Sequence, residues 1–500
     1  MAEEERPRAV LGVDVGSART IGVLLAADGR VLARARVDHA PLAPRPDRLE
    51  QDPETLWSAF REIVQRLKAL VEVRLVGLAL TGEPGGLVFL DRAGVPVRPA
   101  ILGPDRRAEA EAQELAARLP PARLHAIAGR RLGPCLSAAK ILWLAANEPE
   151  AAQRVTKILS PKGYVLFRLT GETVTDASAA SATGLLDLAR RQWSETVLEA
   201  LALDPELLPE VFEGGEVCGR VSVAGAAETG LPVGLPVVAG GSELACAALA
   251  AGMTRQGQGL LWLEPGGGFL LPCGRPLVDP EERLESACGA AGGWLLLGAL
   301  PQAPSALRWL AETLCPEWAE AARAAGLEPV DAVLGEAGAA ERADAPLFFP
   351  GLAEEGILGR PAFAELAFHH GRAALARGVL EGIGFALLDR LERARALGCA
   401  PESLAASGRV AGSEAWSRLL AAQLGIPLRL LAGGLEPERG AAVLAGIGVG
   451  LFRDGVRAAE GIAEAELASI GVEAGLAALE RTRYGRWQRL HRVFAAFATS

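Results

Sequence analysis

A carboxylate and a glycine turn near the N-terminus have the residue types needed to bind phosphate. Asp14 ends the apolar run that begins at Arg8, and Gly16 and Ser17 follow it. A strand that ends in an Asp-x-Gly-Ser turn offers backbone N–H groups and a hydroxyl to phosphate oxygens, and its carboxylate can hold Mg²⁺ through water. The same residues are typical of a tight β-turn whose aspartate only bonds backbone. The pattern alone leaves both interpretations open.

A second carboxylate, Glu243, follows the apolar run Pro236–Ala239 and the turn Gly240-Gly241-Ser242. A carboxylate at the carboxyl end of a strand lies where α/β proteins place their ligands, and it could accept the proton of a substrate hydroxyl. The alternative is that Ser242 caps a helix and Glu243 complements the helix dipole. Local sequence alone favours this second interpretation.

A third segment, Ser407–Ser413 (SGRVAGS), lies between two predicted helices. Gly408 and Gly412 would let a flat ligand approach the backbone, and the N-terminus of the helix that follows would favour phosphate. An ordinary loop in which Ser413 caps that helix explains the same residues equally well.

The elements that must position these residues alternate between strands and helices. An Asp28-Gly29 turn between two apolar runs predicts a hairpin, and Asp52 with Pro53 marks the start of an amphipathic helix. The predicted strands of this part are 8–14, 20–26, 30–37, 74–80 and 87–90. Strands followed by alternating helices and strands predict a mixed sheet flanked by helices, which is the α/β class.

The pattern restarts near residue 235, where turn residues precede a new strand. The elements predicted after it are strands 236–239, 259–264 and 268–272, and helices 373–396 and 415–424. We therefore expect two domains, 1–235 and 236–500. A glycine-bearing turn after an early strand in each half suggests two similar halves that face a shared cleft.

Composition excludes several classes of protein. The 500 residues carry a formal net charge of -10, and the absence of any Lys or Arg block argues against a nucleic-acid partner. Charges or glycines interrupt every apolar stretch before about 18 residues, so no membrane span is predicted. The seven cysteines form no CxxC pair and the five histidines show no metal-ligand spacing. Buried thiols in a reducing cytoplasm are the expected state.

Taken together, the motifs resemble the FGGY family of carbohydrate kinases, most closely its xylulokinase branch. The resemblance extends over essentially the whole chain and its segments occur in order. They are Val10–Leu25 (VLGVDVGSARTIGVLL), Leu49–Trp57 (LEQDPETLW), Gly77–Arg107, Ala139–Asp187 with SPKGYVLFRLTGE, Gly230–Glu243, Arg377–Phe385 and Ser407–Phe452.

This resemblance implies two actin-like (ribonuclease H-like) domains around a central cleft, and transfer of the γ-phosphoryl group of MgATP to a hydroxyl of a small sugar such as a ketopentose. It implies ATP and Mg²⁺ as cofactors and favours a homodimer. The implied roles are Asp14, Gly16 and Ser17 for phosphate, with Asp14 also for Mg²⁺; Glu83 and Asp105 for the sugar; Glu243 as the base; Gly266 for phosphate; and Gly408, Gly412 and Ser413 along adenosine.

Several motif residues differ from the family pattern. Glu83-Pro84-Gly85 replaces Gln-Met-His, Glu243 replaces the catalytic Asp, and Leu263–Gly266 replaces the Gly-Thr-Ser-Gly phosphate loop. The adenosine loop Gly-Gly-Gly-Ala becomes Gly408–Ala411 (GRVA). An alternative is therefore a catalytically impaired paralogue that binds sugar or nucleotide as a regulator. An actin-like filament subunit or chaperone ATPase would share the fold class but lacks the kinase segments.

Overall fold

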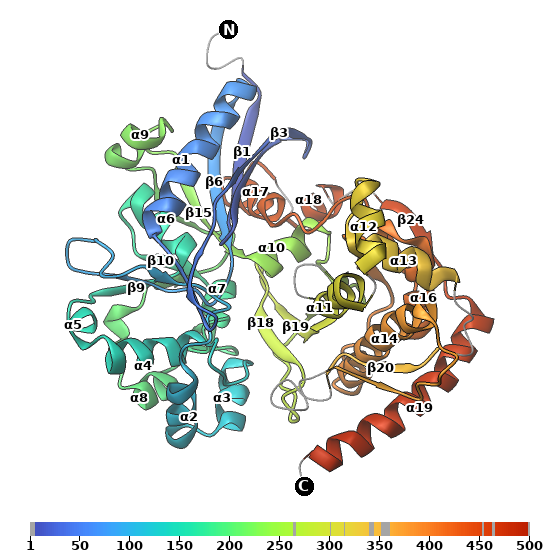
Figure 1. Cartoon of the computed structure of the whole chain (residues 1–500). Coiled ribbons are helices and arrows are strands. Elements are labelled where there is room, and N and C mark those ends of the chain that lie inside the picture. The colour runs from blue at the N-terminus through green and yellow to red at the C-terminus, as the bar shows by residue number, and fades with distance from the viewer. Residues whose placement is uncertain are drawn as a thin grey trace. The chain divides into compact units, whose positions relative to one another are not determined.

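The structure is a computed structural model that describes residues 6–263, 267–300, 302–314, 316–339, 345–351, 361–452, 455–462 and 466–498. Contacts divide the chain into two compact units (Figure 1). Unit 1 consists of Met1–Arg255, Pro272–Leu296 and Glu436–Ala463, and unit 2 consists of Gln256–Leu271, Leu297–Leu435 and Glu464–Ser500. Each unit therefore combines stretches of chain that are far apart in sequence.

Unit 1 contains a six-stranded sheet in the order β14-β15-β6-β1-β2-β3. Its central strand β1 (Arg8–Val15) pairs antiparallel with β2 (Arg19–Ala26) and parallel with β6 (Arg74–Gly82). The remaining strands are β3 (Val31–Asp38), β14 (Val217–Arg220) and β15 (Pro236–Ser242). The predicted hairpin at Gly29 is confirmed: its φ is 83°, and its N–H donates to the carbonyl of Ala26 at 2.9 Å.

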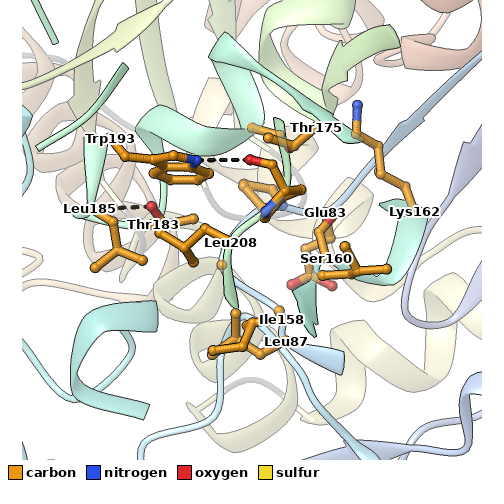
Figure 2. A pocket seen from close by; sticks show the side chains of 17 residues that line it. Glu83, Leu87, Ile158, Ser160, Lys162, Thr175, Thr183, Leu185, Trp193 and Leu208 are labelled. Atoms are coloured by element: carbon orange, nitrogen blue, oxygen red, sulfur yellow. Dashed lines mark hydrogen bonds between the residues drawn. The ribbon is translucent and has the colours of Figure 1, made fainter. Parts of the chain in front are cut away.

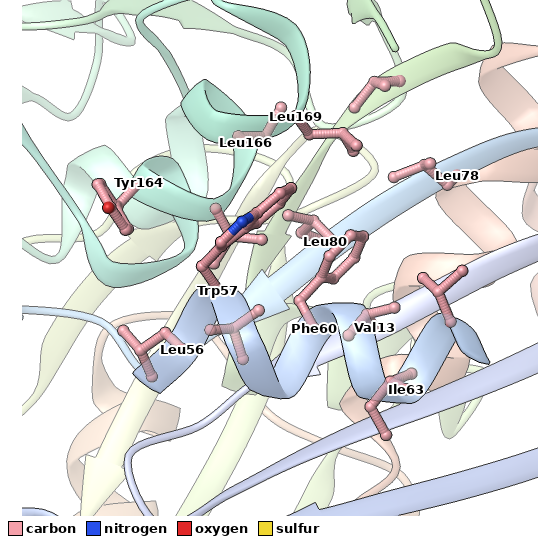
Figure 3. Packing of buried hydrophobic residues seen from close by; sticks show 14 of the residues in the cluster. Val13, Leu56, Trp57, Phe60, Ile63, Leu78, Leu80, Tyr164, Leu166 and Leu169 are labelled. Carbon is pink, nitrogen blue, oxygen red and sulfur yellow. The ribbon is translucent and has the colours of Figure 1, made fainter. Parts of the chain in front are cut away.

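Helix α1 (Pro53–Leu70) covers one face of this sheet, and its predicted start is confirmed. The Asp52 carboxylate accepts the N–H of Glu54 at 3.0 Å. Trp57 and Phe60 of α1 are fully buried, and Figure 3 shows that they point from the helix toward the sheet and α6 (Pro161–Thr170). Leu169 of α6 belongs to the same core. Burial of one such aromatic side chain is worth about 2–3 kcal/mol, so this core fixes α6 against the sheet.

The end of β15 differs from the prediction. The sequence predicts that the strand ends at Ala239, but it continues through Gly240 and Gly241 to Ser242 and leads directly into α10 (Glu243–Ala250). The pairing with β6 shifts between Val238 and Gly241, which is a β-bulge. Ser242 occupies the N-cap position of α10, but its side chain makes no capping hydrogen bond. The predicted turn is thus a bulge, and capping by the serine side chain is wrong.

Only glycine can occupy the bulge. Gly240 has a φ of 76°, and a Cβ built on it would lie 1.9 Å from the carbonyl oxygen of Leu80. A second close approach involves α17 (Pro437–Gly448), because a Cβ on Gly12 would lie 2.0 Å from the carbonyl oxygen of Glu438. These contacts place the starts of α10 and α17 beside the strands of the sheet.

Unit 2 repeats the strand arrangement of unit 1. Here β16 (Leu260–Trp262) pairs antiparallel with β17 (Gly268–Cys273) and parallel with β22 (Leu404–Ala406), which pairs parallel with β23 (Leu428–Leu431). Strands β1, β2, β6 and β15 are related in the same way. Strand β24 (Glu466–Ile470) follows β23. The expected α/β class is confirmed, and the two units share one strand arrangement.

The segment after the long helix α14 (Arg372–Ala396) also differs from the prediction. The sequence predicts a loop up to α16 (Glu414–Leu424), but the chain forms β22 and the short helix α15 (Arg409–Gly412) there. Three-residue strands such as Leu404–Ala406 carry too few residues to show an alternating pattern, and pairing with β16 decides their conformation.

The other elements complete the two units. In unit 1 they are β4 (Leu42–Arg45), β5 (Arg48–Gln51), β7 (Val88–Leu90), β8 (Ala100–Ile101), α2 (Glu109–Arg118), α3 (Pro121–Ala128), α4 (Ser137–Asn147), α5 (Pro149–Ala152), β9 (Lys157–Leu159), β10 (Val174–Asp176), α7 (Ala177–Ser181), β11 (Leu186–Asp187), β12 (Gln192–Trp193), α8 (Glu195–Leu201), β13 (Glu210–Phe212), α9 (Val223–Thr229), β18 (Glu285–Cys288) and α18 (Gly455–Ile462). In unit 2 they are α11 (Gln302–Trp309), α12 (Pro316–Ala324), α13 (Pro329–Ala339), β20 (Leu347–Phe349), β21 (Ala362–Ala364) and α19 (Ala474–Ala498); β19 (Trp294–Ala299) contributes to both.

Within the part of the chain that the structure describes, none of the helices is long and apolar enough to cross a bilayer. The predicted division at residue 235 falls just before β15, which is a strand of the sheet in unit 1. That division, with a sugar-binding part before it and a nucleotide-binding part after it, stays a prediction.

The bulge generates a stability prediction. We expect Gly240→Ala to destabilise the protein by at least about 3 kcal/mol, because it adds left-handed backbone strain to a collision with backbone. Gly171 is the matched control: its φ is 87°, but a Cβ there would meet nothing within 4 Å, so Gly171→Ala costs only about 1–2 kcal/mol. Urea denaturation of both variants measures the difference, and equal losses would contradict the collision.

Candidate active site

Two of the predicted carboxylates meet at the carboxyl ends of parallel strands. Asp14 of β1 and Gly241 of β15 both pair with Thr81 of β6, one from each side, so they lie at the same level of the sheet. Glu243 follows two residues after Gly241 and starts α10. Asp14 is buried, and one of its oxygens, Oδ1, has no hydrogen-bond partner.

Both carboxylates have raised pKa values, and the charge of Glu243 contributes to the shift of Asp14. Burial, followed by repulsion from Glu243 and Glu438, holds the pKa of Asp14 well above its ordinary value. Burial, followed by repulsion from Glu83, raises the pKa of Glu243 to about 7. A carboxyl group with a pKa near 7 is suited to accept a proton at neutral pH.

Sequence reasoning missed two charged residues at this site, Glu438 and Arg19. Glu438 lies in the first turn of α17 and is buried; its Oε1 contacts Arg34 Nη2 at 2.5 Å, while its Oε2 has no partner. The charge of Glu438 raises the pKa values of Asp14 and Glu243, whereas Arg19 at the start of β2 lowers both. In the sequence, Glu438 is an ordinary acidic residue after a helix-starting proline, and only the packing of α17 on β1 places it here.

The turn after β1 is held firmly. Gly16 N–H donates to the carbonyl of Arg19 at 3.1 Å, and Gln51 Nε2 donates to the carbonyl of Ser17 at 3.1 Å. The Ser17 hydroxyl lowers the pKa of the Glu83 carboxyl group, but burial has the larger effect and raises that pKa above its ordinary value. The structure therefore brings Asp14, Ser17, Glu83 and Glu243 into one site.

Asp105 has a different environment. Its carboxylate accepts two hydrogen bonds from the Arg107 guanidinium at 2.8 and 2.7 Å, and the N–H groups of Arg107 and Leu49 at 3.0 and 2.6 Å. Burial raises its pKa, but these hydrogen bonds outweigh burial and hold it below its ordinary value. Both oxygens are thus engaged within the protein, and the side chain is fully enclosed.

The loops that carry Glu83 and Asp105 are joined by the buried side chain of Lys140. Its amino group donates to the carbonyls of Gly85, Leu102 and Gly103 at 3.1, 2.7 and 2.7 Å. Burial lowers the pKa of Lys140 to about 8. The lysine ties together the two segments that the family resemblance assigns to the sugar.

A small pocket lies beside Glu83. Its volume is about 30 Å³, which is enough for about two water molecules. Figure 2 shows Glu83, Ser160, Lys162 and Thr175 along one side and Trp193 and Leu208 along the other. The pocket is far smaller than the roughly 300 Å³ of a ligand cavity, so it is an extension of the site rather than a sugar pocket by itself.

The remaining predicted residues lie elsewhere. Gly408, Gly412 and Ser413 belong to unit 2, where Gly408 precedes α15 with a φ of 67° and Ser413 caps α16 by accepting the N–H of Trp416 at 3.4 Å. The capping alternative for Ser413 is therefore confirmed. Gly266, together with Glu264 and Pro265, lies outside the described residues.

The carboxylates fit a divalent cation that keeps most of its water. Among the residues that the structure describes, no group of three or more His, Cys, Asp or Glu side chains could hold a metal ion. Mg²⁺ in phosphoryl-transfer sites usually takes only one or two carboxylates, with waters and phosphate oxygens as its other ligands. The unpartnered Oδ1 of Asp14 is suited to that role, directly or through water.

Comparison with known proteins gives the chain a class. Residues 9–250 match the N-terminal domain, and residues 273–449 the C-terminal domain, of the FGGY family of carbohydrate kinases. The xylulose kinase of Escherichia coli K12 is 34% identical over 448 residues, which is 87% of this chain and 89% of that protein. The gluconokinase of Bacillus subtilis is 25% identical over 82% of each chain.

A solved structure agrees with these matches. The crystal structure of a xylulose kinase from Rhodospirillum rubrum aligns with a TM-score of 0.90 and 28% identity, and covers 99% of this chain and 100% of that one. The fold and the sequence matches define a sugar kinase with actin-like domains, which uses ATP. The chain belongs to the FGGY family of carbohydrate kinases.

The raised pKa of Glu243 predicts a pH-dependent stability gain for Glu243→Gln. The folded state keeps the proton up to about pH 7, whereas the unfolded state releases it near 4.5, so the parent loses stability as the pH rises between these values. The variant should be more stable than the parent above pH 7 by up to about 3 kcal/mol, with no difference below pH 4.5.

Thermal denaturation from pH 4 to pH 8 tests this expectation. Glu195→Gln is the control, because Glu195 is an exposed first residue of α8 and carries only the helix-start charge. A pH-independent difference for Glu243→Gln would contradict the raised pKa of Glu243.

Proposed function

We propose that this sugar kinase phosphorylates a ketopentose such as xylulose, with Glu243 as the base. The observation that carries the proposal is the pair of carboxylates, the buried Asp14 and the half-buried Glu243, at the carboxyl ends of parallel strands in a chain of this family. The ketopentose is inferred from relatives such as the xylulose kinase of E. coli.

The proposed step is an in-line transfer. The sugar hydroxyl oxygen forms a bond to the γ-phosphorus of ATP, the bond from that phosphorus to the β,γ-bridging oxygen breaks, and ADP leaves with the bonding electron pair. The hydroxyl proton passes to the Glu243 carboxylate. Because the pKa of Glu243 is about 7, a substantial fraction of the group is ionised and ready to accept that proton at neutral pH.

The other residues of unit 1 would hold the phosphates and the sugar. The turn at Gly16 and Ser17 offers backbone N–H groups and a hydroxyl to phosphate oxygens, and Asp14 would hold Mg²⁺, which would supply positive charge to neutralise the phosphates. Arg19 is the cation that acts on both carboxylates, and it would face the transferred group. Glu83 is the candidate contact to sugar hydroxyls.

Asp105 supports the sugar loop in this proposal through its four internal hydrogen bonds, and a direct sugar contact would require one of them to yield. Gly408, Gly412 and Ser413 are proposed to lie along adenosine, and Gly266 beside phosphate. A cytoplasmic location and a homodimer remain part of the proposal, the first because the reaction consumes ATP.

Turnover tests the proposal. We expect ADP release with D-xylulose or another ketopentose and MgATP, and a loss of 10²–10⁴-fold in kcat for Glu243→Gln, the usual range for a positioned base. Glu195→Gln should keep parental kcat, since Glu195 shares only the helix-start position. Full turnover by Glu243→Gln would remove Glu243 from the mechanism, and a parent inactive with every sugar tested would overturn the substrate assignment.

The electrostatics of the site predict opposite pH shifts for two variants. In the parent, kcat/KM should rise with pH through about 7 as Glu243 ionises. Glu438→Gln removes a negative charge, so the midpoint should move to lower pH, whereas Arg19→Gln removes a positive charge and should move it to higher pH. Shifts of the same sign in the two pH–rate profiles would contradict this arrangement.

A further inference from the structure

A buried ion pair lies behind the site and has no role in the proposed step. Lys162 of α6 and Asp176 at the end of β10 are in direct contact, and both side chains are almost completely enclosed. Removing two charges from water costs several kcal/mol per ion, which is recovered only if further hydrogen bonds satisfy both groups. The groups that form hydrogen bonds with Lys162 and Asp176 therefore show which part of the backbone the ion pair holds in place.

Lys162 donates hydrogen bonds to the backbone carbonyls of the bulge in β15. Its Nζ donates to the carbonyls of Ala239 and Gly241 at 3.3 and 3.1 Å, one on each side of Gly240. A bulge interrupts the strand ladder, so carbonyls beside it need other partners when they are buried. The ammonium group also lies 3.5 Å from the carbonyl of Leu80, the oxygen that faces Gly240 from β6.

Asp176 connects the ion pair, through Ser178, to Ser242 at the end of β15. Its Oδ1 accepts hydrogen bonds from the Ser178 hydroxyl at 2.5 Å and from the N–H of Ala179 at 2.9 Å. Because the Ser178 hydroxyl donates its hydrogen bond to Asp176, its oxygen can act as an acceptor, and it accepts the N–H of Ser242 at 2.8 Å. Ser242 directly precedes Glu243.

The hydrogen bonds thus run without interruption from Lys162 through Asp176 and Ser178 to the backbone of Ser242. We propose that Ser178, oriented by the Lys162–Asp176 ion pair, is a positioning residue that fixes the backbone before Glu243 and so directs the carboxylate at the reacting hydroxyl. The proposal rests on the proposed role of Glu243 as the base. Ser178 acts only through Glu243 and touches no substrate.

Helix α7 supplies a closely matched control. Ser181 is buried like Ser178, and its Oγ accepts the N–H of Cys288 at 3.1 Å, so each serine satisfies one buried backbone N–H. Only the N–H bound by Ser178 is next to Glu243. Alanine at either position removes the same chemical group from the same short helix.

The experiment compares Ser178→Ala and Ser181→Ala in the ADP-release assay with D-xylulose and MgATP. We expect Ser178→Ala to lower kcat about 10- to 100-fold, because a misplacement of about 1 Å can cost 10²-fold, with both KM values within about twofold of the parent. Ser181→Ala should keep kcat within about twofold at a similar loss of Tm. Equal kcat losses, or none for Ser178→Ala, would overturn the proposal.

A double-mutant cycle separates this inference from the role of Glu243. If Ser178 acts through Glu243, Ser178→Ala should cause no further loss of kcat in the Glu243→Gln background, and an additive loss overturns the proposal. Full turnover by Glu243→Gln alone would instead refute the base assignment. Ser178→Cys provides a second variant that retains a weak acceptor, and its kcat should fall between those of the parent and Ser178→Ala.

Discussion

The close contact between β15 and β6 at Gly240 is the constraint on which the site depends. Because Gly240 has no side chain, its backbone approaches the Leu80 carbonyl, and the bulge that results directs the chain into α10 at Glu243. The buried ammonium group of Lys162 satisfies the carbonyls on both sides of the bulge. A glycine and a buried cation together make this local geometry possible.

That geometry gathers negative charge in a place where water is scarce. Asp14, Glu243 and Glu438 arrive from β1, α10 and α17; Glu243 and Glu438 both raise the pKa of Asp14, and Glu438 also raises that of Glu243. Such an arrangement costs stability, which is common where a protein keeps carboxylates for chemistry rather than for folding. Arg34 and Arg19 offset part of the repulsion, and a bound Mg²⁺ with its phosphates would offset more.

The two units show how one strand arrangement serves different sequences. In each, a strand pairs antiparallel with the next and parallel with a later one. In unit 1 the turn between the first two strands carries Gly16 and Ser17, and hydrogen bonds from Gly16 and Gln51 hold it. The described departures of this chain from the family pattern, Glu83–Gly85, Glu243 and Gly408–Ala411, follow the strands β6, β15 and β22, so they leave the sheets intact.

The sequence by itself determined the local elements and the family. Alternating apolar runs, the Asp28-Gly29 turn and the Asp52-Pro53 helix start are short-range signals, so β1 to β3 and α1 could be predicted with nearly correct bounds. Motifs that occur in the family's order along most of the chain were enough to indicate a carbohydrate kinase, because each motif is a contiguous stretch of residues.

Only the tertiary structure decided which charges share the site. Glu438 is more than four hundred positions from Asp14 in the chain, and the packing of α17 on Gly12 brings it near. Likewise, Asp105 looked available for a sugar, but four hydrogen-bond donors from the fold already surround it. Local sequence fixes backbone preference over a few residues, whereas proximity, burial and hydrogen-bond partners depend on how distant segments pack, and these set the pKa values on which the chemistry rests.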